Sequence, residues 1–467
     1  MSSEPGTEGQ TGLSRTLSHR HVTMITIGGI IGAGLFVGSS VAIAGAGPAS
    51  VLSYIGSGLI FVLLMQMLAE MAVALPEVRS FSEFARAALG NGVGFVTGWL
   101  YWYFWVVVIP VEAIAGAVLL HGWLPLPTWA LGLGLMAAMT AVNLMSARSY
   151  GEFEFWFASI KVAAIIVFIV VAAAYVFGFA PPGRVVTDLG GHGGFAPHGP
   201  ISVLAALATV FFAMTGAEIT TVAAAESAEP SRAIAAMTRS VMFRILIFYV
   251  VSIFLIVAVV PWTSVKPGYS PFTLALSATG HPWIARSMNV VILTAVLSCL
   301  NSAFYVCSRV LFVLASNGDA PQWLVKVNAR RVPARSVAVG AVAGVVGILL
   351  NSAAPKGMFA FLVNAGGALI VFIYLLTAWS QIRLRFKRQR ERQPEPAIRM
   401  WAFPWLSYAT IAGLIAVLAA MALTPDMASQ LYASLVALAL AVAAYLLRRR
   451  HGRAMAAARR GAAQDRA

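Results

Sequence analysis

Apolar segments, each long enough to cross a lipid bilayer, occupy most of this 467-residue chain. A membrane-spanning helix needs about 20 largely apolar residues, and twelve such segments follow one another along the sequence. With 60% hydrophobic and 10% charged residues, the chain is far too apolar for an ordinary soluble domain. The sequence predicts an all-α polytopic membrane protein with both termini on one side. The twelve segments are 22–46, 50–75, 94–120, 126–145, 153–179, 201–225, 240–261, 284–314, 336–352, 358–382, 402–423 and 428–447.

The formal net charge is +15, and the positions of the basic residues explain it. If the amino terminus is cytoplasmic, 26 of the 32 Lys and Arg residues fall in cytoplasmic segments, four fall outside, and Lys161 and Arg309 lie in spans. This is the positive-inside bias, so both termini are predicted to be cytoplasmic. The clusters Arg383 to Arg399 and Arg448 to Arg460 indicate contact with an anionic leaflet. The expected partner is therefore the lipid bilayer, and no nucleic acid is expected.

No cofactor or metal site is predicted. Cys299 and Cys307 lie eight residues apart in one predicted helix, which separates them by about 12 Å and is too far for a disulfide. The first twenty residues are polar and lack the apolar core of a signal peptide. The sequence has no metal-spaced His and carboxylate cluster, no phosphate-binding loop and no activated Ser or Cys constellation. It gives no support for an enzyme.

The stretch Ile27 to Ser40, IGGIIGAGLFVGSS, is poorly suited to an unbroken helix. It contains five glycines, and each costs about 1 kcal/mol relative to alanine in a helix interior. In hydrocarbon, unpaired backbone groups are tolerated only beside a protein-lined or watery cavity. The pattern therefore predicts a broken helix at a binding site. The alternative is that Gly28 and Gly32 form a GxxxG face for close packing.

A second interruption, Met214 to Glu218, falls in the middle of the sixth segment. Gly32 and Gly216 lie 184 residues apart, and each belongs to the first helix of a five-helix set. Because five spans reverse the chain direction, this arrangement favours two inverted repeats with a substrate site at the midplane. The predicted organisation is a polar leader (1–21), two repeats (22–180 and 201–385), helices 11 and 12 (400–447) and a basic cytoplasmic tail (448–467).

Four charged residues are candidates for function. Glu112, deep in the third span, either reads the amino group of a substrate or pairs with another helix. Glu218 follows the second break and is a functional candidate by default, although it could simply tie two helices together. Glu70, near the inner end of the second span, is predicted to anchor a cytoplasmic gate. Lys161 is either functional or a side chain that snorkels to the inner surface, about 15 Å away.

The eighth span adds the polar residues Ser298 and Ser302. Cys299 faces the predicted cavity if these serines do, and otherwise it is packing. The run GWLYWYFW opens the third span and is suited to an interfacial belt or a pore wall. From that run Tyr101 is a gate candidate, with wall or core packing as the alternative.

Several runs resemble those of the amino acid transporter family in the amino acid–polyamine–organocation superfamily. They are HRHVTMITIGGIIGAGLFVGSS, GPASVLSYIGSG, LAEMAVALPE, GEFEFWFASIK, TGAEITTVAAAESAEPSRAI, SCLNSAFYVCSRVLF and NGDAP. The combination with GWLYWYFWVVVIPVEAIAGAVLLHGW is most similar to bacterial 4-aminobutyrate (GABA) permeases. The resemblance implies a LeuT-like fold of twelve helices, a five-plus-five inverted repeat with broken helices 1 and 6, in a bacterial inner membrane.

The two broken helices provide partners for both ends of an amino acid. Free N–H groups around Ala33, Gly34 and Leu35, with Ile31 and Gly32 beside them, are expected to attract the carboxylate. By similarity to the fold, carbonyls at the end of the first half of helix 6 take the ammonium. These are near Phe212, Ala213 and Thr215, followed by Gly216 and Glu218.

The resemblance also implies a role for Lys161 in energy coupling. In proton-coupled relatives a helix 5 lysine takes the place of a sodium ion. Here its ammonium would reach the carbonyls of Gly28 to Ile31 and the hydroxyl of Ser298 or Ser302. Desolvation makes reversible protonation of a lysine accessible, so the proton gradient is the expected energy source.

The predicted function is a proton-coupled importer of an amino acid, with GABA as the first candidate substrate. The same mechanism with proline, alanine or an aromatic amino acid is the alternative. A membrane enzyme or a channel is the alternative from a different class. The sequence leaves open whether the protein is a monomer or a homodimer.

Overall fold

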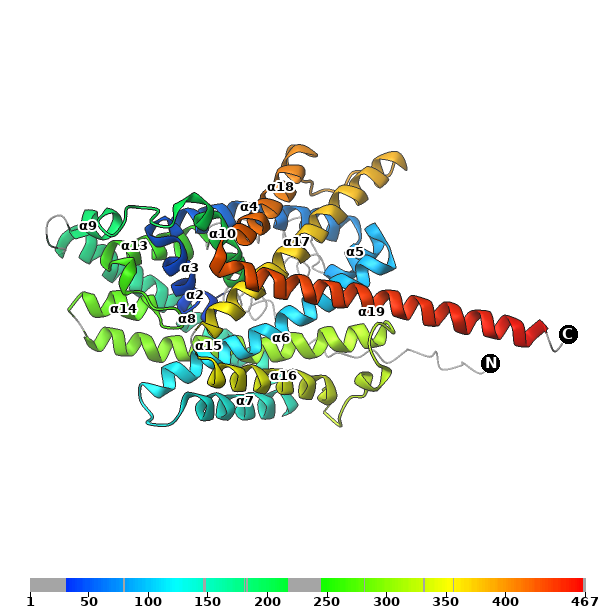
Figure 1. The fold of residues 1–467 in the computed structure, drawn as a ribbon, viewed down its shortest axis with the longest axis horizontal. Coiled ribbons are helices and arrows are strands. Elements are labelled where there is room, and N and C mark those ends of the chain that lie inside the picture. Colours follow the sequence, from blue (N-terminus) through cyan, green and yellow to red (C-terminus); the bar gives the residue numbers. More distant parts are fainter. Residues whose placement is uncertain are drawn as a thin grey trace, which may run out of the picture.

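A computed structural model of the chain describes residues 31–78, 80–145, 148–179, 181, 184–216, 245–280, 282–330, 332–355 and 357–464. The described part is a bundle of long helices that run roughly along one axis (Figure 1). Its α-helices are α2 (Ala33–Phe36), α3 (Ser39–Ala46), α4 (Ser50–Ala74), α5 (Phe81–Leu89), α6 (Asn91–His121), α7 (Thr128–Met145), α8 (Arg148–Ala174), α9 (Arg184–Gly190), α10 (Gly199–Met214), α13 (Ser252–Val259), α14 (Pro271–Ala278), α15 (Pro282–Ser316), α16 (Ala334–Ala353), α17 (Met358–Arg390), α18 (Trp405–Leu423) and α19 (Pro425–Gln464).

The described helices confirm an all-helical polytopic membrane protein. Nine of them are long and apolar enough to cross a bilayer, and the first, Ala33–Ala74, overlaps both the first and the second predicted segments. Two shorter apolar helices, Gly199–Met214 and Ile247–Val259, overlap the sixth and seventh predicted segments. Every predicted segment therefore overlaps a described apolar helix.

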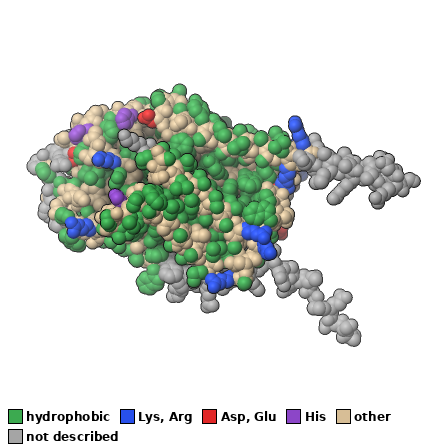
Figure 2. Space-filling model, turned by 60° about the horizontal axis from the view of Figure 1, so that its bottom comes forward, with side chains coloured by type: hydrophobic (Ala, Val, Ile, Leu, Met, Phe, Trp, Pro, Cys, Tyr) green, Lys and Arg blue, Asp and Glu red, His purple; other side chains and the backbone are tan. Residues whose placement is uncertain are grey.

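The outer surface of the bundle is apolar, as a lipid-facing surface must be. Large hydrophobic side chains are exposed along α16 and α19, among them Val342, Leu350, Val436 and Leu440. Figure 2 shows hydrophobic side chains over the middle of the visible face, with Lys and Arg towards its edges. Such a surface is stable in hydrocarbon and would aggregate in water.

The central helix of the bundle is α6, which is more deeply buried than any other candidate span. It packs against α15, α17, α16, α7 and α5. Its neighbours in Figure 1 therefore include helices from both halves of the chain. Side chains on α6 consequently reach the middle of the protein from one rigid element.

The structure adds detail to the predicted segments. The Gly- and Pro-containing segment Pro181 to Pro200, between the fifth and sixth predicted spans, contains the short helix α9. Helix 1 is interrupted within its described part, because α2 ends at Phe36 and α3 begins at Ser39, and this interruption lies in the stretch Ile27 to Ser40. The last helix, α19, continues to Gln464 and extends past the end of the bundle in Figure 1. Ser80 is the N-cap of α5, since its hydroxyl accepts a hydrogen bond from the Glu83 N–H at 3.3 Å.

Candidate functional site

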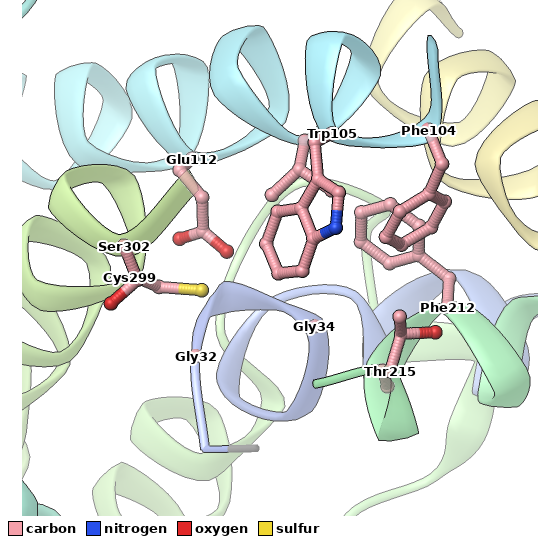
Figure 3. A pocket seen from close by; sticks show the side chains of 11 residues that line it. Gly32, Gly34, Phe104, Trp105, Glu112, Phe212, Thr215, Cys299 and Ser302 are labelled. Carbon is pink, nitrogen blue, oxygen red and sulfur yellow. The ribbon is translucent and has the colours of Figure 1, made fainter. Parts of the chain in front are cut away.

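A small cavity lies where the start of α2, the end of α10, the middle of α6 and the middle of α15 meet (Figure 3). Its volume is ≈ 30 Å³, which is about the space of one water molecule. A wall of aromatic side chains from α6 and α10 faces polar side chains from α6 and α15. The described residues that line it are Gly32, Gly34, Phe104, Trp105, Val108, Glu112, Phe212, Ala213, Thr215, Cys299 and Ser302.

The first wall is the start of α2. Gly32 is extended and precedes the helix, and the Ala33 N–H donates to Glu112 Oε2 at 3.3 Å. The Leu35 N–H donates to the Gly32 carbonyl at 3.2 Å. The expectation that the N–H groups of Ala33 and Leu35 are free is therefore wrong for this conformation. At this wall the backbone of Gly32 and of Gly34 lines the cavity.

Glu112 is buried, with 1% of its surface exposed. The position of this carboxylate agrees with both of its alternatives. It pairs with another helix, because it binds the start of α2, and it can reach a substrate, because it lines the cavity. A carboxylate at a helix start is stabilised by the helix dipole and by the backbone N–H groups. Glu112 thus occupies a position that the carboxylate of an amino acid would also favour.

The glycines of α2 allow close approach on two sides. A Cβ at Gly32 would lie 2.6 Å from Cys299 Sγ, and a Cβ at Gly34 would lie 2.7 Å from the Ala213 Cα. Close packing at Gly32 agrees with one half of the proposed Gly28 and Gly32 face, while Gly28 lies outside the described residues. Gly32 and Gly34 also line the cavity.

The second wall is the end of α10. The helix ends at Met214, Thr215 is extended, and Gly216 has a φ of 116°. Phe212, Ala213 and Thr215 line the cavity. The Ala213 carbonyl already accepts a hydrogen bond from the Tyr249 hydroxyl at 3.0 Å, so it has one remaining lone pair for an ammonium.

The polar side chains of α15 divide between two places. Cys299 and Ser302 line the cavity, whereas the Ser298 hydroxyl accepts a hydrogen bond from Lys161 Nζ at 2.8 Å. Lys161 is only 1% exposed. Its ammonium therefore lies inside the protein, and the alternative that it snorkels to the surface is wrong.

Other predicted site residues do not line the cavity. Ile31, Ala33 and Leu35 are buried and are not among its lining residues. Tyr101 packs edge-on against the Trp105 ring, with centroids 6.2 Å apart. Glu70 joins α4 to α17, because its Oε2 accepts hydrogen bonds from Gln381 Nε2 and Arg385 Nη1, each at 3.0 Å. Two further candidates, Gly28 and Glu218, lie outside the described residues.

Three cavity residues were not predicted: Phe104, Trp105 and Val108. Trp105, Val108 and Glu112 follow the spacing i, i+3, i+7, which places them on one face of a helix. That spacing from Glu112 is the signal in the sequence that identifies Trp105 and Val108.

A sequence profile of the amino acid permease family matches residues 21–457. The chain belongs to the amino acid permease family. Members of this family are transporters, so the protein is an amino acid permease of the membrane and not an enzyme. The match runs through every helix that forms the cavity.

Individual relatives share much of the sequence. The gamma-aminobutyric acid permease of Bacillus subtilis is 42% identical over 446 residues, which cover 95% of each chain. That of Escherichia coli is 45% identical over 88% of each chain. An aromatic amino acid transport protein of Corynebacterium glutamicum is 39% identical over 87% of this chain and 90% of its own length.

Among solved structures, a mutant of the Eremococcus coleocola manganese transporter has a similar fold. The TM-score is 0.56 at 12% sequence identity, over 91% of this chain and 94% of that one. This likeness concerns the fold alone.

Proposed function

We propose that this permease imports 4-aminobutyrate together with protons. The observation that carries the proposal is the set of relatives named as GABA permeases, at 42% and 45% identity over most of both chains. The relative named for aromatic amino acids is less similar, at 39%. The bacterial inner membrane, with both termini in the cytoplasm, is the proposed location.

The proposed architecture has twelve spans, with inverted repeats at 22–180 and 201–385 and broken helices 1 and 6. In its favour, α10 ends at Met214 in the protein interior, and α2 begins there at Ala33. Helices that start and stop inside the bundle place backbone donors and acceptors at a buried site. The leader at 1–21, helices 11 and 12 and the basic tail complete the organisation.

Substrate is proposed to bind between these two helix ends. The amides near Gly34 face the carboxylate, and the carbonyls near Phe212 and Thr215 face the ammonium. Because Glu112 holds the Ala33 N–H, the substrate carboxylate competes with Glu112 for that donor. When Glu112 is displaced, its carboxylate becomes available to the ammonium of the substrate. The cavity volume of ≈ 30 Å³ requires the walls to separate before an amino acid can bind.

Lys161 is proposed to carry the coupling proton. The pair of its ammonium and the Ser298 hydroxyl joins α8 to α15 in the protein interior. Protonation from one side and release to the other would then accompany movement of substrate.

Competition for uptake tests the substrate. In a host that lacks its own GABA transport, the wild-type chain is expected to take up labelled GABA saturably and to show counterflow. Unlabelled GABA should compete better than proline, alanine or aromatic amino acids, and a protonophore should abolish accumulation. If GABA does not compete while another amino acid does, the GABA assignment is wrong. Unsaturable flux without counterflow would indicate a channel.

A further inference from the structure

The indole nitrogen of Trp105 is a buried hydrogen-bond donor at the cavity. Trp105 is 5% exposed and lines the cavity. Its Nε1 has no hydrogen-bond partner among the described residues. Figure 3 shows the indole between Glu112 and Phe104, with the nitrogen on the edge that faces Phe212. Buried donors without partners are rare in folded proteins, and each one requires an explanation.

The other polar groups around the cavity are engaged. Glu112 accepts a hydrogen bond from the Ala33 N–H, and the Thr215 hydroxyl donates to the Phe211 carbonyl at 2.8 Å. The indole N–H is therefore a donor at the cavity that no described protein group uses, and a bound molecule with an acceptor would satisfy it.

Packing alone does not require a nitrogen at this position. The indole ring makes edge-on contacts with Tyr101, at a centroid distance of 6.2 Å, and with Phe104, at 5.5 Å. A phenylalanine would preserve much of these contacts, whereas the N–H adds a desolvation cost unless an acceptor meets it.

We propose that the Trp105 indole N–H donates a hydrogen bond to the substrate carboxylate, which makes Trp105 a specificity-determining residue. This proposal rests on the proposed function in one respect, namely that the substrate is an amino acid and therefore carries a carboxylate. A carboxylate oxygen is the strong acceptor that every amino acid carries.

The experiment compares Trp105→Phe with the wild type, and Trp102→Phe is the matched control. Trp102 lies one turn earlier on α6 and packs on Trp99 outside the cavity lining. Its Nε1 is likewise buried without a hydrogen-bond partner among the described residues, so the control removes a comparable N–H that does not face the cavity. Inhibition of labelled uptake is measured with the unlabelled amino acid and with analogues that lack the carboxylate, which for GABA are n-butylamine and 4-aminobutanamide. Surface expression is quantified for each variant.

Trp105→Phe should raise the inhibition constant of the amino acid about tenfold, because the lost bond is to a charged group. The constant of n-butylamine, which has no acceptor for the N–H, should stay nearly unchanged. The constant of 4-aminobutanamide, whose neutral carbonyl oxygen is a weaker acceptor than a carboxylate, should rise less than that of the amino acid. Trp102→Phe should change none of these constants. If amino acid and analogues shift together, or neither shifts, the N–H serves packing or a water molecule and the proposal is overturned.

Failure of the proposed function has a different signature. If wild-type uptake identifies another amino acid, the same comparison is made with that amino acid, its amine and its amide. The ratio of the inhibition constants of that amino acid and its amine then tests the Trp105 proposal.

Discussion

At the scale of single residues, the closest helix crossing of the site depends on Gly34. A Cβ at this position would lie 2.7 Å from the Ala213 Cα, and backbone cannot move aside as a flexible side chain can. Gly34→Ala should destabilise the fold by about 1–3 kcal/mol and strongly reduce uptake, because α2 and α10 must move apart. Thermal unfolding in detergent and initial uptake rates measure the two effects.

Gly45→Ala is the matched control for this change. Gly45 lies in α3, and a Cβ there would meet nothing within 4 Å. Alanine is also the better helix former. Uptake and unfolding temperature should be retained or slightly raised, and a loss as large as that of Gly34→Ala would contradict the role given to the crossing.

A second residue-scale prediction concerns the partner of Lys161. Ser298→Ala removes the hydroxyl that accepts from Nζ at 2.8 Å and leaves a buried ammonium less well solvated. Uptake driven by an imposed inward proton gradient should fall severalfold. Lys161→Met should lose the response to the gradient altogether. Both are measured in proteoliposomes with and without a pH step.

Ser287→Ala is the control on the same helix, because that hydroxyl is exposed and bonds to the Trp283 carbonyl of its own helix. It should behave as wild type. A well-folded Lys161→Met protein whose uptake still rises with the proton gradient would rule out coupling through Lys161.

The sequence predicted which polar residues belong to the site better than it predicted how those residues are arranged. Charge and glycine content identified Glu112, Lys161 and Gly34, because such residues are costly or unusual inside a membrane. It could not tell which serine of α15 meets Lys161, since Ser298 and Ser302 are separated by only about 40° around a helix. It also missed Trp105, because tryptophan is common in apolar walls and its unpaired N–H is visible only in three dimensions.

At the scale of elements, α4 and α17 are joined by a buried ion pair. The Glu70 and Arg385 side chains, 5% and 12% exposed, meet at 3.0 Å. The Met400 N–H donates to the same carboxylate oxygen at 2.6 Å. Glu70→Ala should lower stability by about 3–5 kcal/mol, because it leaves a partly buried arginine without its carboxylate. The unfolding temperature in detergent measures this effect.

The control for Glu70 is Glu395→Ala, which removes an exposed ion pair with Arg399. Exposed pairs contribute about 0.2–1 kcal/mol, so this variant should unfold near the wild-type temperature. If both variants lost the same amount of stability, burial would not be what sets the strength of the α4–α17 ion pair.

Element boundaries followed from the sequence where apolar runs determine them. Segment 336–352 corresponds to α16 (Ala334–Ala353), because an uninterrupted apolar run of that length is stable as a helix in a membrane. The end of α10 at Met214 lies two residues from the predicted break at Gly216. By contrast, α9 lies in a Gly- and Pro-containing segment that resembles a loop, and the extension of α19 has no apolar run to mark it.

At the scale of the whole molecule, one end of the bundle is held by Asp319. This buried carboxylate pairs with Arg86 of α5 and with Arg448 of α19. Its carbonyl accepts a hydrogen bond from Trp99 Nε1 of α6 at 3.1 Å. The basic residues that the positive-inside bias assigns to the cytoplasm therefore gather at a real structural end of the protein.

The orientation of the molecule follows from the same charges and is testable. Gly194, in the segment between α9 and α10, should lie outside the cell. Asn328, between α15 and α16 next to Lys326 and Arg330, should lie inside. Alkaline phosphatase fused after Gly194 should be active, because the enzyme folds only in an oxidising compartment, and the fusion after Asn328 should be inactive.

A fluorescent protein fused to the carboxyl terminus completes the test, since it should mature in the cytoplasm. Levels of each fusion are compared by immunoblot so that activity reports location and not amount. The reverse pattern, with activity after Asn328 and none after Gly194, would invert the protein in the membrane. The cluster around Asp319 would then lie at the outer face, and the basic residues could not have set the orientation.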